Sequence, residues 1–214
     1  MMSMPSSLKV FQNTGLGKLF LEAQARIGRA KWKKVVDAAY HSKVKAELLI
    51  PRAAREKHAI YVASPEQGIL LSTNFCYTSG LLRRKFGNDK SLKVIASYLM
   101  SAFGQLQFEL EGGNQEGMLK IEAFMVRGMK SIDPDELKSE EVDSLCAALE
   151  QFDALGESVK GDEGIETPRR DLDLAMASVL INHGIGGFEN NAKLADFAEL
   201  FLKDLVDDRS NQNG

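Results

Sequence analysis

The chain has 214 residues, of which 44% are hydrophobic and 27% are charged. This composition is typical of a globular protein with a core of its own, so folding requires neither a disulfide framework nor a structural metal. No run approaches the roughly 18 apolar residues of a membrane-spanning helix, and the first residues lack the pattern of a secretory signal. We therefore expect a cytoplasmic protein that has no membrane partner.

The charges are divided unequally along the chain. Residues 1–95 hold 17 Lys and Arg against 6 Asp and Glu, a net charge of +11. Residues 96–214 hold 10 basic residues against 24 acidic ones, a net charge of −14. This asymmetry indicates an anionic partner for the basic half, but it does not indicate a reaction.

The first predicted elements are basic N-terminal helices over about residues 16–49. Gly28 divides this stretch or kinks it, and Pro51 marks its end. An inward face follows from apolar residues at three- and four-residue steps, namely Trp32, Val35, Val36 and Ala39.

Residues 58–126 predict a small four-stranded antiparallel sheet with a covering helix. A first hairpin joins strands at 58–63 and 69–75 through a turn at Pro65 and Gly68. The covering helix begins at Gly87-Asn88-Asp89 and stops near Gly104. Alternating apolar residues at 106–110 and 119–123 then predict a second hairpin. The alternative is a mostly α protein in which 105–126 is helical.

The remaining chain predicts an acidic α-helical C-terminal part. Asp133-Pro134 resembles a helix start, and Thr167-Pro168 begins a helix that runs to His183-Gly184. Between them, residues 156–166 form an acidic loop where we expect nicking or disorder. The core face of the helix after Asp133 consists of Val142, Leu145, Leu149 and Phe152. The last helix starts at Asn190 or Asn191 and has an apolar face of Leu194, Phe197, Phe201 and Leu205.

The predicted fold class is therefore α+β. We expect a basic α+β domain over residues 1–130 and an acidic helical subdomain over 131–206. A flexible tail over 207–214 follows.

The basic half supplies the candidate binding residues, because Lys and Arg neutralise phosphates and release their counterions. Arg83, Arg84 and Lys85 lie beside Phe86 and near Tyr77 in the sequence, which combines charge with rings for base stacking. A solvated face, or a surface that docks on the protein's own acidic half, is the alternative interpretation. The candidates for nucleic-acid binding are Arg26, Arg29, Lys31, Lys33, Lys34, Lys43, Lys45, Arg52, Arg55, Lys57, Arg83, Arg84 and Lys85.

Motifs for other chemistry are weak. The sequence Gly15-Leu16-Gly17-Lys18 lacks the earlier glycine and the following Ser or Thr of a phosphate loop. The histidines His41, His58 and His183 show no metal-ligand spacing, and Cys76 and Cys146 are interpreted as packing residues. The acidic residues are explained by helix starts and solvated faces. We therefore predict no catalytic residue, no metal and no cofactor.

Three hypotheses of function follow. The first is a non-enzymatic nucleic-acid-binding protein or ribonucleoprotein-complex subunit that contacts the phosphate backbone, with the type of nucleic acid left open. The second is a protein–protein interaction or assembly module, which uses its opposite charges for a partner or for self-association. The third is an enzyme whose site converges only in the fold.

Overall fold

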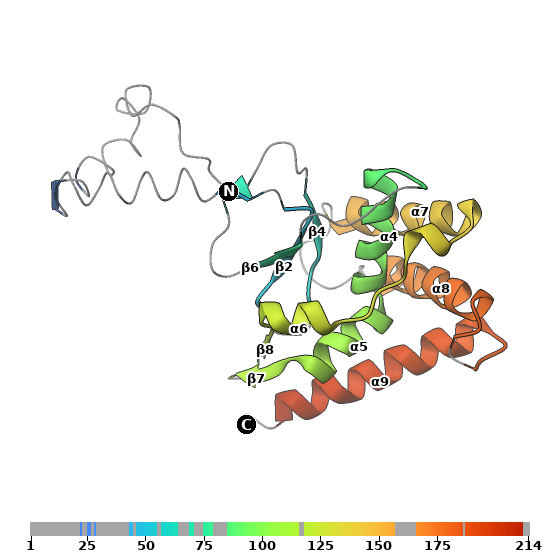
Figure 1. Ribbon diagram of the computed structural model, residues 1–214. Coiled ribbons are helices and arrows are strands. Elements are labelled where there is room, and N and C mark those ends of the chain that lie inside the picture. The colour runs from blue at the N-terminus through green and yellow to red at the C-terminus, as the bar shows by residue number, and fades with distance from the viewer. Residues whose placement is uncertain are drawn as a thin grey trace. The chain divides into compact units, whose positions relative to one another are not determined.

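A computed structural model describes residues 22, 25–26, 28, 43–44, 46–54, 57–63, 69–70, 75–78, 85–115, 118–156, 166–185 and 187–211 (Figure 1). The chain divides into two compact units. The first comprises Met1–Ala46 and Ser64–Thr73, and the second comprises Glu47–Ala63 and Asn74–Gly214. The sequence predicts a domain boundary at residue 130 instead, and that boundary stays a prediction.

In the first unit, the described residues belong to a helix and to one pair of strands. Residues 22, 25 and 26 are helical, and Gly28 follows with a φ of 82°. A residue with a Cβ is unfavourable at positive φ, and the non-helical Gly28 agrees with the interruption that the sequence predicts at this position. β1 (Lys43–Val44) pairs antiparallel with β5 (Ile69–Leu70). The predicted second basic helix falls mostly on residues 29–42, which lie outside the described residues.

Two three-stranded antiparallel sheets form the β part of the second unit (Figure 1). In one, β2 (Leu48–Pro51) lies between β4 (Tyr61–Val62) and β6 (Phe75–Thr78). In the other, β8 (Met118–Lys120) lies between β3 (Ala53–Ala54) and β7 (Gly113–Gln115). A bend at residue 52 carries the chain from the first sheet to the second.

The predicted hairpin between 58–63 and 69–75 is wrong, and so is the helix predicted to reach Leu49. In the second unit β4 pairs with β2, whereas β5 pairs with β1 in the first unit. Leu48 and Ile50 are fully buried while Leu49 is partly exposed, which is the period of a strand with one covered face. The partners of these short strands lie far along the chain, so local spacing did not reveal them.

Helices make up the larger part of the second unit. The helix starts at Asn88, Glu166 and Asn191 agree with the sequence, whereas Asp133-Pro134 begins a short 3-10 turn and the helix predicted there starts at Ser139. α4 follows Gly87, which has a φ of 79°. The Asp133 side chain accepts a hydrogen bond from the Asp135 backbone at 3.0 Å, and Asn190 accepts one from Ala192 at 2.8 Å. The helices are α4 (Asn88–Met100), α5 (Ala102–Glu111), α6 (Ala123–Gly128), α7 (Ser139–Gly156), α8 (Glu166–Asn182) and α9 (Asn191–Asn211), with a 3-10 turn η1 (Pro134–Glu136).

The core of this unit lies between the β4-β2-β6 sheet and the helices. Leu48, Ile50 and Cys76 of the sheet pack with residues of α4, α5, α7 and α8. α7 packs against both α4 and α8, and α9 packs against α5 and α8. Of the face predicted for the helix after Asp133, Val142, Leu145 and Leu149 are buried, and Phe152 is half-buried against the core. Within the part of the chain that the structure describes, no helix combines the length and apolar character needed to cross a membrane.

The strand predicted at 106–110 is wrong, because these residues belong to α5. The buried positions Ala102, Gln105 and Phe108 follow each other at three-residue steps, and Leu110 is 64% exposed. Gln105 is a polar residue in the core, since its amide binds the backbone of His58 and of Leu99. The predicted four-stranded sheet is therefore replaced by the two smaller sheets. The α+β class is confirmed.

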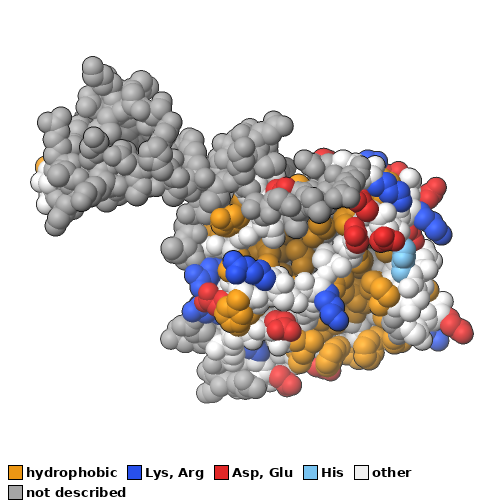
Figure 2. All heavy atoms as spheres, viewed as in Figure 1, with side chains coloured by type: hydrophobic (Ala, Val, Ile, Leu, Met, Phe, Trp, Pro, Cys, Tyr) orange, Lys and Arg blue, Asp and Glu red, His pale blue; other side chains and the backbone are white. Residues whose placement is uncertain are grey.

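The apolar face predicted for the last helix is also displaced. α9 buries Leu194, Ala195, Ala198 and Leu202. Phe197 and Phe201, which the sequence placed on the core face, are 55% and 42% exposed. Figure 2 accordingly shows hydrophobic side chains gathered at the surface where α9 runs in Figure 1.

Candidate nucleic-acid interface

The structure describes five of the predicted basic residues. Arg26 and Lys43 belong to the first unit, where Arg26 is exposed on the helix and Lys43 lies in β1. Arg52, Lys57 and Lys85 belong to the second unit. The other candidates lie outside the described residues, namely Arg29, Lys31, Lys33, Lys34, Lys45, Arg55, Arg83 and Arg84.

Arg52 has a structural partner. Its guanidinium forms an ion pair with Glu122, and the Glu122 carboxylate also lies 3.6 Å from the ammonium of Lys120. The hydrogen bond from Arg52 is the main cause that lowers the pKa of Glu122 below its usual value. The Arg52 backbone oxygen accepts a hydrogen bond from Ile121 at 2.8 Å. Arg52 therefore helps to hold β3 and β8 together at the bend between the two sheets.

Lys85 is also engaged within the fold. Its ammonium donates to the backbone oxygen of Leu137 at 2.6 Å, and its backbone N–H donates to the Asp135 carboxylate at 3.1 Å. The same ammonium lies 4.8 Å from the centre of the Phe86 ring. These contacts attach the segment before α4 to the η1 turn, so Lys85 supports the fold as well as adding charge.

The rings expected beside this charge occupy different environments. Phe86 is half-buried and packs against the helical core. Tyr77 of β6 is 44% exposed, and on the same sheet Tyr61 of β4 is 52% exposed. Both tyrosines are paired with Leu49 of β2, one on each side. Paired residues share a face of an antiparallel sheet, so this face presents two rings to solvent.

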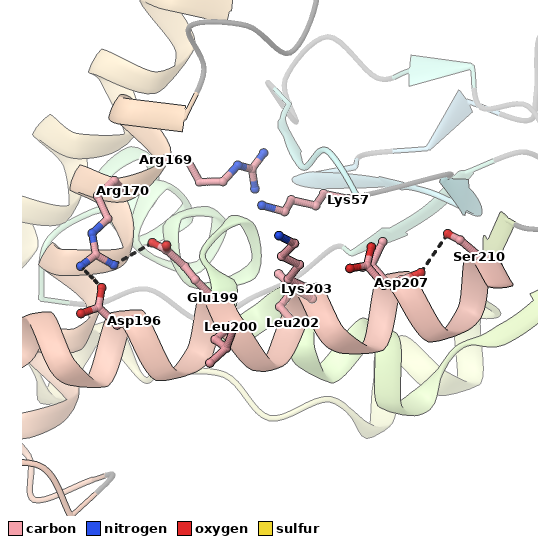
Figure 3. Close-up of a pocket in the computed structure, with 11 residues that line it drawn as sticks. Lys57, Arg169, Arg170, Asp196, Glu199, Leu200, Leu202, Lys203, Asp207 and Ser210 are labelled. Carbon is pink, nitrogen blue, oxygen red and sulfur yellow. Dashed lines mark hydrogen bonds and ion pairs between the residues drawn. The ribbon is translucent and has the colours of Figure 1, made fainter.

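Lys57 lines a pocket of about 850 Å³ on the second unit, between α8 and α9. Figure 3 shows that Lys57, Arg169 and Lys203 extend into the same space from three separate elements. Lys57 comes from the segment between β3 and β4, Arg169 is the fourth residue of α8, and Lys203 lies on α9. The fold thus combines one cation from the basic half with two from the acidic half.

The pocket also contains carboxylates, and Arg170 binds two of them. Its guanidinium forms an ion pair with Asp196, and a second with Glu199 at 2.9 Å. The Glu199 hydrogen bond is the main cause that raises the pKa of Arg170. Asp207 is the remaining carboxylate of the lining. Arg170 therefore links α8 to α9 and compensates the acidic side chains at one end of the pocket.

Two contacts orient the Arg169 side chain. One guanidinium nitrogen donates to the backbone oxygen of Met100 at 3.3 Å. The guanidinium carbon also lies 5.1 Å from the centre of the Phe152 ring, a cation–π distance. Both contacts orient the side chain before any ligand is present.

Asp173 is a buried carboxyl group one turn beyond Arg169. It is fully buried, and its Oδ1 accepts a hydrogen bond from the Ala102 N–H at 2.6 Å, at the start of α5. Its Oδ2 has no hydrogen-bond partner among the described residues. Burial raises the pKa of Asp173 to about 7, against the lowering effects of the Ala102 N–H, Arg169 and Lys57. The Asp173 side chain therefore changes its charge near neutral pH.

Arg169, Arg170 and Lys203 were missed by the sequence analysis, because they lie in the half with a net charge of −14. One local signal was present. Cations in the first turn of a helix oppose the helix dipole, so the pair that follows Thr167-Pro168 needed a separate explanation.

The cysteines and His183 have contacts within the fold. Cys76 and Cys146 are buried free thiols, and burial raises the pKa of both above the usual value. His183, just after α8, lies 3.3 Å from the Glu141 carboxylate, which also accepts a hydrogen bond of 3.0 Å from the Asn182 amide. Among the described residues, no group of three or more His, Cys, Asp or Glu side chains is arranged to hold a metal ion.

Comparison with known proteins relates the chain to restriction endonucleases. A solved chain from work titled "Characterization and crystal structure of the type IIG restriction endonuclease BpuSI" superposes on 98% of this chain, with a TM-score of 0.62 and 19% identity. That likeness shows a shared fold, and this chain spans 23% of the solved chain's length. The comparison with curated proteins gives no match. The family model described as "Restriction endonuclease BpuSI, specificity domain" matches residues 18–152, more than half of the 214-residue chain. The chain therefore belongs to the family of the BpuSI restriction endonuclease specificity domain.

Proposed function

We propose that this chain binds double-stranded DNA and contributes the choice of sequence to a restriction endonuclease. Family membership over residues 18–152 is the observation that carries the proposal. A restriction endonuclease acts on DNA, and the name of the specificity domain describes the part that selects the site. The net charge of +11 on residues 1–95 supports the same partner, because phosphate contacts supply much of the affinity for DNA.

Contacts to the DNA backbone and contacts to the bases have different roles. Phosphate contacts fix the position of a protein on the duplex, and contacts to base edges select the sequence. We assign the phosphate contacts to the predicted basic residues, above all to Lys57 among those that the structure describes. Arg52 and Lys85 also support the fold, so replacing them changes stability together with binding. A ribonucleoprotein complex, a protein partner and a cytoplasmic location stay predictions.

The direct test is binding of a fluorescent DNA duplex, measured by anisotropy over a series of salt concentrations. We expect log K to fall linearly with log salt, with a slope of about −0.9 for each phosphate contacted. The variant R83Q/R84Q removes two predicted contacts, so the slope becomes shallower by about 1.8. K130Q/K193Q is the matched control, because it removes the same charge from exposed residues outside the predicted set.

Absence of binding at the lowest salt concentration contradicts the proposal. Equal slopes for R83Q/R84Q and the control leave DNA binding intact but remove Arg83 and Arg84 from the interface. Competition with unlabelled duplexes of random sequence then measures sequence preference.

A further inference from the structure

Three cationic side chains that lie far apart in the sequence extend into one pocket between α8 and α9 (Figure 3). We propose that Lys57, Arg169 and Lys203 form a phosphate-binding site and that, if the chain binds DNA as proposed above, this site holds the DNA backbone. Arg169 and Lys203 lie outside residues 18–152, so the family match does not assign this site.

The distribution of charge favours an anion at this position. Of the acidic side chains in the lining, Asp196 and Glu199 form ion pairs with Arg170 at one end. Lys57, Arg169 and Lys203 share the remaining space with Asp207. Like charges that face one another repel, and a bound anion relieves this repulsion. Three cations in one pocket therefore attract a phosphate more strongly than a single surface lysine does.

The Arg169 side chain of this site is already oriented before a ligand binds. The Met100 backbone oxygen and the Phe152 ring hold the Arg169 guanidinium, whose planar fork suits two phosphate oxygens. Arg169 is also the fourth residue of a 17-residue helix, and the positive end of the helix dipole adds to its charge. A ligand that binds here loses less free energy in ordering this side chain.

The remaining walls favour a nucleic-acid backbone over a free phosphate ion. Leu200 and Val206 of α9 line the same pocket, and they offer apolar contact to a deoxyribose. The pocket volume of about 850 Å³ accommodates more than one phosphate group together with its sugar. A chain of alternating phosphate and sugar uses both the cations and the apolar wall.

Lys203→Gln is the cleanest variant, because Lys203 is exposed on α9 and its replacement leaves the core intact. We expect DNA affinity to fall by up to about eightfold near 0.1 M salt, since one phosphate contact changes the salt slope by about 0.9. Lys193→Gln on the same helix is the matched control, because Lys193 is exposed and lies outside the pocket. Lys57→Gln should match Lys203→Gln. Arg169→Gln should show a larger loss, with its folding checked by thermal melting.

A second measurement separates the sources of phosphate. Pyrophosphate is titrated into the full chain and followed by NMR of the lysine side chains, in wild type and in Lys203→Gln. If neither Lys203→Gln nor Lys57→Gln differs from Lys193→Gln in DNA affinity, the inference is overturned. If wild type binds DNA at another surface, the proposed function still stands. If wild type binds pyrophosphate at Lys203 but binds no DNA, the proposed function fails and the backbone assignment fails with it, while the phosphate site itself stands.

Discussion

At the scale of single residues, burial decides the charge of two groups in the second unit. His58 is 2% exposed and stacks on Phe108 with 4.9 Å between ring centres. Burial, together with a smaller effect of the Arg209 charge, lowers the pKa of His58 to about 4. Neither ring nitrogen has a hydrogen-bond partner among the described residues. His58 therefore packs as a neutral ring, and it stabilises the fold less as the pH falls from about 6.5 through about 4.

Asp173 has the opposite effect on stability. Its pKa is raised in the fold to about 7, so the folded state holds a proton that the unfolded state releases at lower pH. Its contribution to stability is fully present below the ordinary value of about 3.9 and is lost as the pH rises through about 7. Arg169, Lys57 and Glu199 are the charged side chains that act on it from α8, the segment before β4 and α9.

The substitution Asp173→Asn tests this effect. The amide oxygen can still accept the Ala102 hydrogen bond, but the side chain does not ionise. We expect the variant to gain stability relative to wild type at about pH 8 compared with about pH 5, measured by urea unfolding at both values. Asp171→Asn, an exposed position on the same helix, serves as the control. The same difference between variant and wild type at both pH values would contradict the interpretation.

At the scale of elements, the corner between α4 and α5 shows how a glycine can be misinterpreted. Gly104 was expected to stop a helix, yet it lies inside α5 and is buried. The chain turns at Ser101 instead, where the extended backbone separates the two helices. A Cβ on Gly104 would lie 2.3 Å from the Tyr98 oxygen and 2.5 Å from the Leu99 Cα. The glycine is therefore needed for the close approach of α5 to the end of α4.

Gly104→Ala should destabilise the protein by about 1–3 kcal/mol, because the atoms that a Cβ meets belong to the backbone and cannot move aside. Gly128→Ala in α6 is the matched control, since a Cβ there meets no atom within 4 Å. We expect the control to change stability by less than about 1 kcal/mol. Urea unfolding measures both. If the two substitutions have the same effect, the close approach does not limit this position.

At the scale of the whole molecule, the second unit pairs residues of the basic half with residues of the acidic half. Lys90 and Lys93 of the basic half lie 2.6 Å from Asp143 and 3.0 Å from Glu150 of α7. Arg52 is paired with Glu122 in the same way. Part of the positive charge is thus matched by the protein's own acidic half, which was the alternative interpretation of the charge split. The net charge of each half therefore overstates the charge that a ligand meets.

One long-range ion pair fixes the C-terminal helix α9 in the second unit. The Arg209 guanidinium donates two hydrogen bonds of 3.0 Å to Glu109, one to each carboxylate oxygen, and joins α9 to α5. Both side chains are buried, with exposed fractions of 6% and 4%. α9 continues to Asn211, so residues 207–211, which the sequence assigned to the tail, are helical.

Arg209→Met should cost about 3–5 kcal/mol of unfolding free energy, because it leaves the Glu109 carboxylate buried without its cation. The double variant E109L/R209M removes both charges, and we expect it to recover most of that loss. Chemical denaturation of the two variants and wild type completes the comparison. A double variant no more stable than Arg209→Met would show that the ion pair is not the reason for the loss.

The sequence by itself determined the fold class, the helix starts after Gly87 and Asn190, the capped turn at Asp133, and the excess of positive charge in the first half. These features depend on neighbours within a few residues, where glycine conformation, capping side chains and apolar spacing act directly. Only the tertiary structure decided the pairing of the strands, the helical state of 106–110 and the buried face of α9. It alone brought Arg169 and Lys203 to Lys57. Each of these depends on hydrogen bonds and packing between distant segments, and such contacts leave no periodic trace in the chain.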